Sequence, residues 1–148
     1  MKLAYQWDLP SDPRPIVLIG AGGIVNDAHL PAYQIAKFPV LGIHDINSDN
    51  LEKTAKTWDL ESYEDITDLI DIAAVSDAVF DLATPPSVIA EILELLPNRA
   101  TVMIQKPMGS NLAEASRILE ICQRKEFAAA VNFQLRFSPM MLSVRDAL

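Results

Sequence analysis

The chain has 148 residues, of which 50% are hydrophobic and 22% are charged, and this balance is typical of one folded domain. Its formal net charge of −8 argues against nonspecific nucleic-acid binding, which requires clustered Lys and Arg side chains to neutralise phosphates. No apolar run approaches the roughly 18 residues of a membrane helix, and the N-terminus lacks the apolar core of a signal peptide. We therefore expect a cytoplasmic protein with no membrane partner.

Residues 1–15 are predicted to form an arm without a regular element, because they contain three prolines that disfavour a helix and cannot donate to a sheet. Two aromatic residues, Tyr5 and Trp7, leave two alternatives open. They either pack the arm onto the domain or belong to a mobile tail.

Beyond the arm, short apolar runs alternate with helical patterns. Pro31 predicts a break or kink in the first helix, and Ser48 is placed to cap the second. Near-continuous apolar strands separated by amphipathic helices indicate a doubly wound parallel sheet covered on both faces, an α/β fold of the Rossmann type. We expect strands over 16–20, 39–45, 78–83, 100–105 and 127–133, a short strand or turn at Tyr63, and helices over 24–37, 49–58, 65–74, 87–96 and 111–125.

The last residues are predicted to open a further helix, with Ser138 as its N-cap and Pro139 in its first turn. The single cysteine, Cys122, follows the apolar spacing of its helix, so we interpret it as a small core residue. One cysteine cannot form an intrachain disulfide or, alone, a zinc site. We expect no metal site.

The first apolar strand runs directly into Gly20-Ala21-Gly22-Gly23. Gly20 permits a tight turn, and Gly22 lets the backbone approach a pyrophosphate at a helix N-terminus. The third small position of the dinucleotide fingerprint is occupied by Val25, which should hold the helix slightly farther from the strand. By itself this glycine turn is also compatible with a purely structural role.

Asp45 follows the second apolar run. A carboxylate at this position can accept both ribose hydroxyls of an adenosine and repels a 2′-phosphate. The next residues, Ile46 and Asn47, supply no cation for such a phosphate. The pattern therefore favours NAD over NADP, although a solvated loop carboxylate is the simpler alternative.

Two later strand ends also carry distinctive residues. The strand over 78–83 contains Asp81 within an apolar run, so this carboxylate either points to a rim or has a hydrogen-bond partner. It leads into Ala83-Thr84-Pro85-Pro86, a rigid turn that can wall a cofactor site. The strand over 100–105 ends in Gln105-Lys106-Pro107, where a lysine can donate to a substrate hydroxyl or take part in acid–base chemistry.

Taken in this order, these residues resemble the N-terminal half of the Gfo/Idh/MocA family of oxidoreductases, which includes glucose–fructose oxidoreductase and inositol dehydrogenase. The resemblance covers about residues 15–148. The matching pieces are Gly20-Ala21-Gly22-Gly23-Ile24, His29-Leu30-Pro31-Ala32, Asp45, Thr84-Pro85-Pro86, Lys106-Pro107-Met108 and Asn132-Phe133-Gln134-Leu135-Arg136-Phe137.

The resemblance implies a nicotinamide-dependent dehydrogenase that acts on a hydroxyl of a sugar, cyclitol or related polyol. It implies that Lys106 is the catalytic lysine of the family's Glu-Lys-Pro motif, where it binds or polarises the reacting hydroxyl. The remaining residues are implied to contact the cofactor. They are Gly20, Gly22, Gly23 and Ile24 at the pyrophosphate, Asp45 and Ile46 at the ribose, Ala83, Thr84 and Pro85 along the cofactor, and Gln105, Lys106, Asn132 and Arg136 toward the nicotinamide.

The chain departs from the family pattern at three positions and in its length. Gln105 stands where the family usually has Glu, Ile89 where a His often occurs, and Val25 where a small residue is usual. The family continues into a second α/β domain that supplies the substrate pocket and usually the oligomer interface. We expect that domain to be absent here, with an arm over 1–15, a dinucleotide-binding domain over 16–138 and the start of a linker helix over 139–148.

Three functional hypotheses follow from the sequence. The first is the NAD-binding half of a sugar or polyol dehydrogenase, which binds cofactor but does not turn over alone. The second is a non-catalytic nucleotide-binding or scaffold module of the same fold, for which Gln105 and Val25 would be signs of lost catalysis. The third keeps the fold but replaces NAD with another adenosine compound. A homo-oligomer is compatible with all three.

Overall fold

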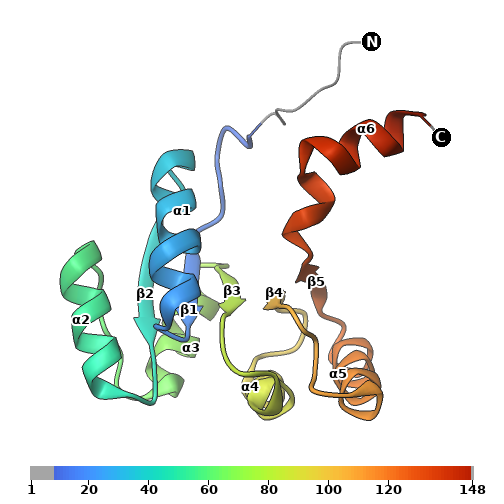
Figure 1. Ribbon diagram of the computed structural model, residues 1–148. Helices are drawn as coiled ribbons and strands as arrows, with labels where there is room; N and C mark the ends of the chain where they lie inside the picture. The colour runs from blue at the N-terminus through green and yellow to red at the C-terminus, as the bar shows by residue number, and fades with distance from the viewer. Residues whose placement is uncertain (1–8, 148) are drawn as a thin grey trace.

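A computed structural model describes residues 9–147, and its centre is a five-stranded sheet in which all neighbouring strands are parallel (Figure 1). The strand order is β2-β1-β3-β4-β5, so the chain crosses from one half of the sheet to the other after β2. This topology confirms the predicted doubly wound α/β fold. The strands are β1 (Ile16–Ile19), β2 (Val40–His44), β3 (Val79–Leu82), β4 (Thr101–Gln105) and β5 (Ala128–Asn132).

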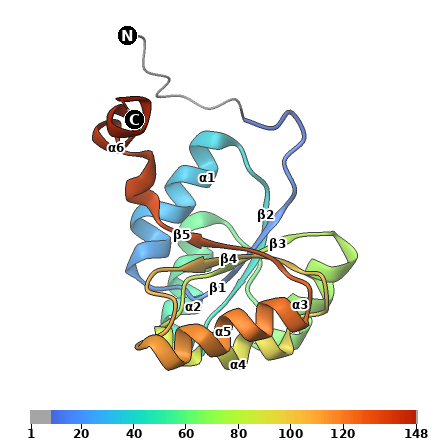
Figure 2. The same cartoon turned by 90° about the vertical axis from the view of Figure 1, so that its right-hand side faces the viewer.

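Helices cover both faces of the sheet (Figure 2). The helices of one face pack against Leu18 and Ile43, whereas those of the other face pack against Val17, Phe80 and further apolar strand residues. Cys122 belongs to this second cluster, so it is a buried core residue as predicted. The first face carries α1 (Leu30–Ala36) and α2 (Ser48–Trp58), and the second carries α3 (Ile66–Val75), α4 (Ile89–Leu95) and α5 (Leu112–Arg124).

The first helix begins with a widened turn. Residues Val25–His29 form a π-turn, η1, and the N–H of Leu30 donates to the carbonyl oxygen of Val25, five residues earlier. The α-helical pattern starts at α1, with Pro31 in its first turn. Proline has no N–H and cannot donate to the carbonyl oxygen four residues earlier, as an α-helix requires. The break predicted at Pro31 therefore takes the form of a change from π to α geometry.

Two local expectations are resolved by the structure. Ser48 is not the cap of α2, because Asn47 precedes the helix and its side-chain oxygen accepts from the N–H three residues later at 2.9 Å. The short strand or turn expected at Tyr63 is reduced to an isolated bridge between Ile43 and Ser62, and Tyr63 itself lies in irregular chain. The strand over 78–83 is therefore the third strand of the sheet.

At the N-terminal end, residues 9–15 contain no regular element, and Arg14 ties them to the domain. Its guanidinium donates to the backbone oxygen of Asp77 at 2.7 Å, to the Asp77 carboxylate at 2.6 Å and to a threonine hydroxyl on β4 at 2.8 Å. The proposed contacts of Tyr5 and Trp7 lie outside the described residues.

After β5, the chain forms η3, a 3-10 helix over Gln134–Phe137, and then α6 over Pro139–Ala147. Ser138 caps α6 as predicted, because its hydroxyl oxygen accepts from the N–H of Met141 at 3.4 Å. Between residues 9 and 147, no helix is long and apolar enough to cross a membrane.

Candidate functional site

The turn after β1 is held by the ends of the two neighbouring strands. Gly20 has a φ of 111°, and a Cβ at this position would lie 2.5 Å from the carbonyl oxygen of Ala83. The N–H of Gly20 donates to the oxygen of His44 at 2.8 Å, and the N–H of Ala83 donates to the oxygen of Ile19 at 2.9 Å. A Cβ at Gly22 would meet no atom within 4 Å. The turn therefore requires glycine at position 20. At position 22, by contrast, the space that a Cβ would occupy is open.

Polar side chains brace this turn from the helix side. The Asn26 amide nitrogen lies 3.1 Å from the carbonyl oxygens of both Ala21 and Gly22, and 3.0 Å from the hydroxyl of Thr54. The amide oxygen of Asn26 in turn accepts from Trp58 Nε1 at 3.0 Å. Sequence reasoning missed this brace, because hydrophobic periodicity identifies the apolar face of a helix and carries no information on polar partners 28 or 32 residues away.

Asp45 lies at the end of β2 and faces the glycine turn. Its Oδ2 accepts from the N–H of Ala21 at 2.6 Å, and its Oδ1 accepts from the N–H of Asn47 at 2.7 Å. The carboxylate thus fixes the turn as well as bordering the site. Each carboxylate oxygen retains a second lone-pair direction, so Asp45 can still accept a ligand hydroxyl.

A pocket of about 510 Å³ opens beside this turn. Its apolar wall includes Val88, Ile92 and Leu95 from the segment that follows the Thr84-Pro85 turn, and sequence reasoning did not identify this wall. The Oγ1 of Thr84 is buried without a hydrogen-bond partner. Seven residues predicted to bind the cofactor line this pocket, and they are Gly20, Gly22, Asp45, Ile46, Ala83, Thr84 and Pro85.

The next two predicted residues, Gly23 and Ile24, do not line this pocket. They form the first helical turn after Gly22, where backbone N–H groups have no intrahelical acceptor. Their contribution to a ligand site is therefore their main chain. The Ile24 side chain is 38% exposed, so it is available beside that main chain.

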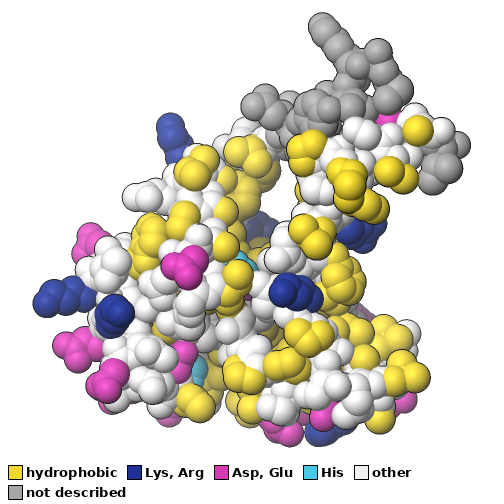
Figure 3. Space-filling view, viewed as in Figure 1, with side chains coloured by type: hydrophobic (Ala, Val, Ile, Leu, Met, Phe, Trp, Pro, Cys, Tyr) yellow, Lys and Arg dark blue, Asp and Glu magenta, His cyan; other side chains and the backbone are white. Residues whose placement is uncertain are grey.

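A second pocket, of about 630 Å³, lies at the ends of β4 and β5. Lys106 and Arg136, both predicted from the sequence, line it, and both side chains are exposed. The other lining residues include Phe133, Leu135 and Met141 from the η3 and α6 segment. Figure 3 shows that the surface is hollowed between α1 and this segment, with apolar side chains along its rim.

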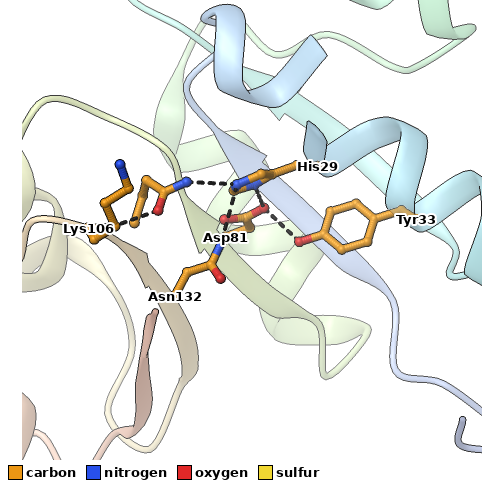
Figure 4. A network of polar contacts seen from close by, with 6 residues as sticks. His29, Tyr33, Asp81, Lys106 and Asn132 are labelled. Atoms are coloured by element: carbon orange, nitrogen blue, oxygen red, sulfur yellow. Dashed lines mark hydrogen bonds and ion pairs between the residues drawn. The ribbon is translucent and has the colours of Figure 1, made fainter. Parts of the chain in front are cut away.

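Gln105 and Asn132 are also predicted to contact the cofactor, but they line neither pocket, and their amide groups face His29 instead. Figure 4 shows Asn132 beside His29. The Gln105 amide nitrogen is 3.0 Å and the Asn132 amide nitrogen 3.5 Å from His29 Nε2. The other ring nitrogen, Nδ1, is 2.6 Å from Oδ2 of Asp81. The hydroxyl of Tyr33 donates to the same oxygen at 2.7 Å.

Asp81 is fully buried, and both of its hydrogen-bond partners, His29 and Tyr33, reach Oδ2, whereas Oδ1 is buried without a partner. Its position in that run was the sequence signal, but its partners lie 48 and 52 residues away. Burial, followed by the nearby charge of Asp81, raises the pKa of Tyr33 well above its usual range. Among residues 9–147, no group of three or more His, Cys, Asp or Glu side chains is placed to hold a metal ion.

The fold, the glycine turn and the acidic residue after β2 define a domain of the dinucleotide-binding class. A family model described as an oxidoreductase family with an NAD-binding Rossmann fold, GFO_IDH_MocA, matches residues 14–133. The chain therefore belongs to the Gfo/Idh/MocA oxidoreductase family, and the matched residues are its NAD-binding Rossmann domain. This confirms the resemblance found in the sequence motifs.

Individual relatives agree with this assignment. Glucose-6-phosphate 3-dehydrogenase of Bacillus subtilis is 33% identical over 126 residues, which cover 84% of this chain and 35% of that protein. The chain spans 35 to 43% of the length of the curated relatives it matches.

Solved structures share the fold. The WlbA dehydrogenase of Chromobacterium violaceum, in complex with NADH and UDP-GlcNAcA, has a TM-score of 0.76 at 21% identity, covering 93% of this chain and 40% of that one. KijD10, a 3-ketoreductase of Actinomadura kijaniata in complex with NADP and TDP-benzene, has a TM-score of 0.72 at 19% identity, covering 91% and 42%.

Proposed function

We propose that this chain is the cofactor-binding part of a dehydrogenase that transfers hydride between NAD and a hydroxyl of a sugar or related polyol. The observation that carries the proposal is the placement of two pockets along one edge of the sheet, with the glycine turn and Asp45 at one and Lys106 at the other. Relatives named for glucose 6-phosphate oxidation, or solved with a sugar nucleotide, support a sugar-type substrate.

The residues around the first pocket fit the adenosine and pyrophosphate parts of NAD. The open space before Gly22 and the free N–H groups of the following turn suit a pyrophosphate. Thr84 offers a buried hydroxyl that has no protein partner. The apolar wall of Val88 and Ile92 suits the faces of an adenine ring.

We assign Lys106 to the reacting end of the site. Its ammonium group is exposed at the second pocket, where it can donate a hydrogen bond to a substrate hydroxyl and stabilise negative charge as a proton leaves. The nicotinamide supplies the hydride acceptor when NAD is bound. Arg136 and the apolar residues of the same pocket would border the nicotinamide end.

The 148-residue chain by itself is proposed to bind NAD without turnover. A hydride acceptor reacts only when substrate is held against it in a defined geometry. Besides Lys106, Gln134 and Arg136, the second pocket is lined by apolar side chains, among them Leu135 at 74% exposure. Such side chains do not fix the remaining hydroxyls of a sugar.

Isothermal titration calorimetry with NADH tests the binding proposal directly. We expect saturable binding to the wild-type chain and loss of that binding in Gly22→Ala, whose Cβ would fill the open space before the backbone. An absence of saturable NADH heat at millimolar cofactor would refute the proposal. A parallel assay of sugar-dependent NADH formation checks the expectation that the chain does not turn over alone.

Cofactor preference is proposed to depend on the charge of Asp45. Replacing it with alanine should reduce the preference for NADH over NADPH by roughly tenfold, since a 1.4 kcal/mol electrostatic difference corresponds to that factor. Asp45→Asn is the comparison variant, because it keeps an oxygen toward the N–H of Ala21 while it removes the charge and the acceptor for the N–H of Asn47. An unchanged preference in both variants would contradict the assignment of Asp45.

A further inference from the structure

A chain of hydrogen bonds leads from the interior of the domain to the backbone of Lys106. His29, Asp81 and Gln105 are 6%, 0% and 8% exposed, so all three lie in the interior. Buried polar groups destabilise a fold unless they find hydrogen-bond partners. The last hydrogen bond of this series is donated by the N–H of Lys106 to Oε1 of Gln105 at 2.8 Å.

The donor and acceptor of each hydrogen bond in this series follow from the last bond, which the N–H of Lys106 donates. A backbone N–H can only donate, so the Gln105 oxygen must face Lys106 and the Gln105 amide nitrogen must face His29. That nitrogen is also only a donor, and it lies 3.0 Å from Nε2 of His29. Nε2 must therefore accept, and it carries no proton.

The other side of the ring agrees with this assignment. Nδ1 of His29 lies 2.6 Å from a carboxylate oxygen of Asp81, so it is the nitrogen that donates. The same oxygen accepts from Tyr33 on α1. The amide nitrogen of Asn132, on β5, is a second donor on the Nε2 side at 3.5 Å. Figure 4 shows the ring between its carboxylate and amide partners.

We propose that His29 is a positioning residue for Lys106: as the neutral ring protonated on Nδ1, it anchors the Gln105 amide, which anchors the backbone N–H of Lys106. The consequence for hydride transfer rests on the function proposed above, whereas the protonation pattern does not. A second proton on Nε2 would bring two donors face to face. Gln105 would then have to turn or detach, and Lys106 would lose its anchor.

Two environments act on the ring in opposite senses. On the Nδ1 side, the carboxylate of Asp81, which also accepts from the hydroxyl of Tyr33, requires a ring nitrogen that donates. The amide nitrogens of Gln105 and Asn132 face Nε2, and they favour a ring that accepts there. The residue type at position 105 thus decides whether Nε2 of His29 meets a donor or an acceptor.

Nitrogen-15 NMR of the histidine rings in the full chain tests this directly, since the chain contains only two histidines. A His44→Gln variant assigns the signals. We expect wild-type His29 at pH 7 to show a protonated Nδ1 and a bare Nε2. In Gln105→Glu, a carboxylate oxygen replaces the amide nitrogen, and both ring nitrogens should be protonated at pH 7.

Gln123→Glu adds the same charge at an exposed position of α5, and it should leave the His29 signals as in wild type. A wild-type ring protonated on Nε2 at pH 7 would overturn the proposal, and this measurement requires no change at position 105. A ring with a bare Nε2 in folded Gln105→Glu would overturn it as well.

Hydrogen exchange of the Lys106 amide tests the positioning role. As acid adds the second proton to His29, the protection of this amide should fall about tenfold relative to neighbouring β4 amides, the factor expected for the loss of one hydrogen bond. In Gln105→Glu, a protonated ring is already accommodated, so this fall should be absent. Equal behaviour in both proteins would refute the positioning role. All spectra are recorded without cofactor, so a failure of NADH binding leaves this test intact.

Discussion

The two pockets at the carboxyl ends of the strands differ in what forms them. The pocket beside the glycine turn is framed by main-chain bonds, including Gly20 to His44 and Ala83 to Ile19. The pocket at Lys106 is framed by side chains, including Phe133 and Leu135, which are 51% and 74% exposed. Main-chain geometry tolerates few substitutions, whereas a wall of exposed side chains can change without disturbing the fold.

On the proposed function, the first pocket takes the cofactor and the second borders the substrate. The backbone frame suits the pyrophosphate and ribose, which are the same in every NAD molecule. A buried polar connection runs from the domain interior through His29 and Gln105 to Lys106 at the second pocket. The first pocket should therefore respond to backbone strain, and the second to changes in the buried polar network.

Gly20→Ala should have the largest effect, because it combines a positive φ with a Cβ 2.5 Å from a backbone oxygen. We expect a loss of about 3 kcal/mol in the free energy of unfolding, measured by chemical denaturation. Gly22→Ala is the matched control, and its stability should stay within about 0.5 kcal/mol of wild type. Equal destabilisation by both substitutions would contradict a frame that depends on the backbone of Gly20.

Asp81→Asn tests the buried network beside the second pocket. The change can keep an oxygen toward the two donors that share Oδ2, but it removes the buried charge that strengthens both bonds, so the free energy of unfolding should fall by about 2 kcal/mol. Asp77→Asn is the same chemical change at an exposed residue, whose side chain is 84% exposed, and it should cost little. If the two variants were equally stable, Asp81 would not hold the network together.

Tyr33→Phe should change the alkaline stability of the protein. The raised pKa of Tyr33 means that the folded state keeps its proton while the unfolded chain loses it near pH 10. Unfolding then releases a proton, so stability is complete below pH 10 and falls as the pH rises above it, by up to about 1.4 kcal/mol per pH unit. The variant should be about 1 kcal/mol less stable at pH 7 and should lose this alkaline component. Denaturation curves from pH 7 to 11 measure both effects.

The smallest effect is expected at the cap of α2. Asn47→Ala removes the acceptor for the first turn of the helix and should cost about 1 kcal/mol. Ser48→Ala lies one residue later, inside the helix, and should be nearly neutral. Thermal unfolding of the two variants compares them, and the reverse order of stability would contradict the assignment of Asn47 as the cap.

Much of the fold and part of the site could be predicted from local patterns. The apolar runs predicted all five strands, and the motifs at the ends of those runs predicted seven of the residues that line the first pocket. The N-cap of α2 could not be predicted from local patterns. Ser48 and Asn47 are both good cap residues, and only the backbone conformation decides which one precedes the helix.

The sequence by itself determined the α/β class, the glycine turn, the acidic residue after β2 and the family, because each depends on residue types at short spacings. Only the tertiary structure decided what Asp81, Gln105 and Asn132 contact. Their partner, His29, lies 52, 76 and 103 residues away in the chain. A parallel sheet places strands that are far apart in the chain side by side, with a helix packed across them, so no local pattern encodes those contacts.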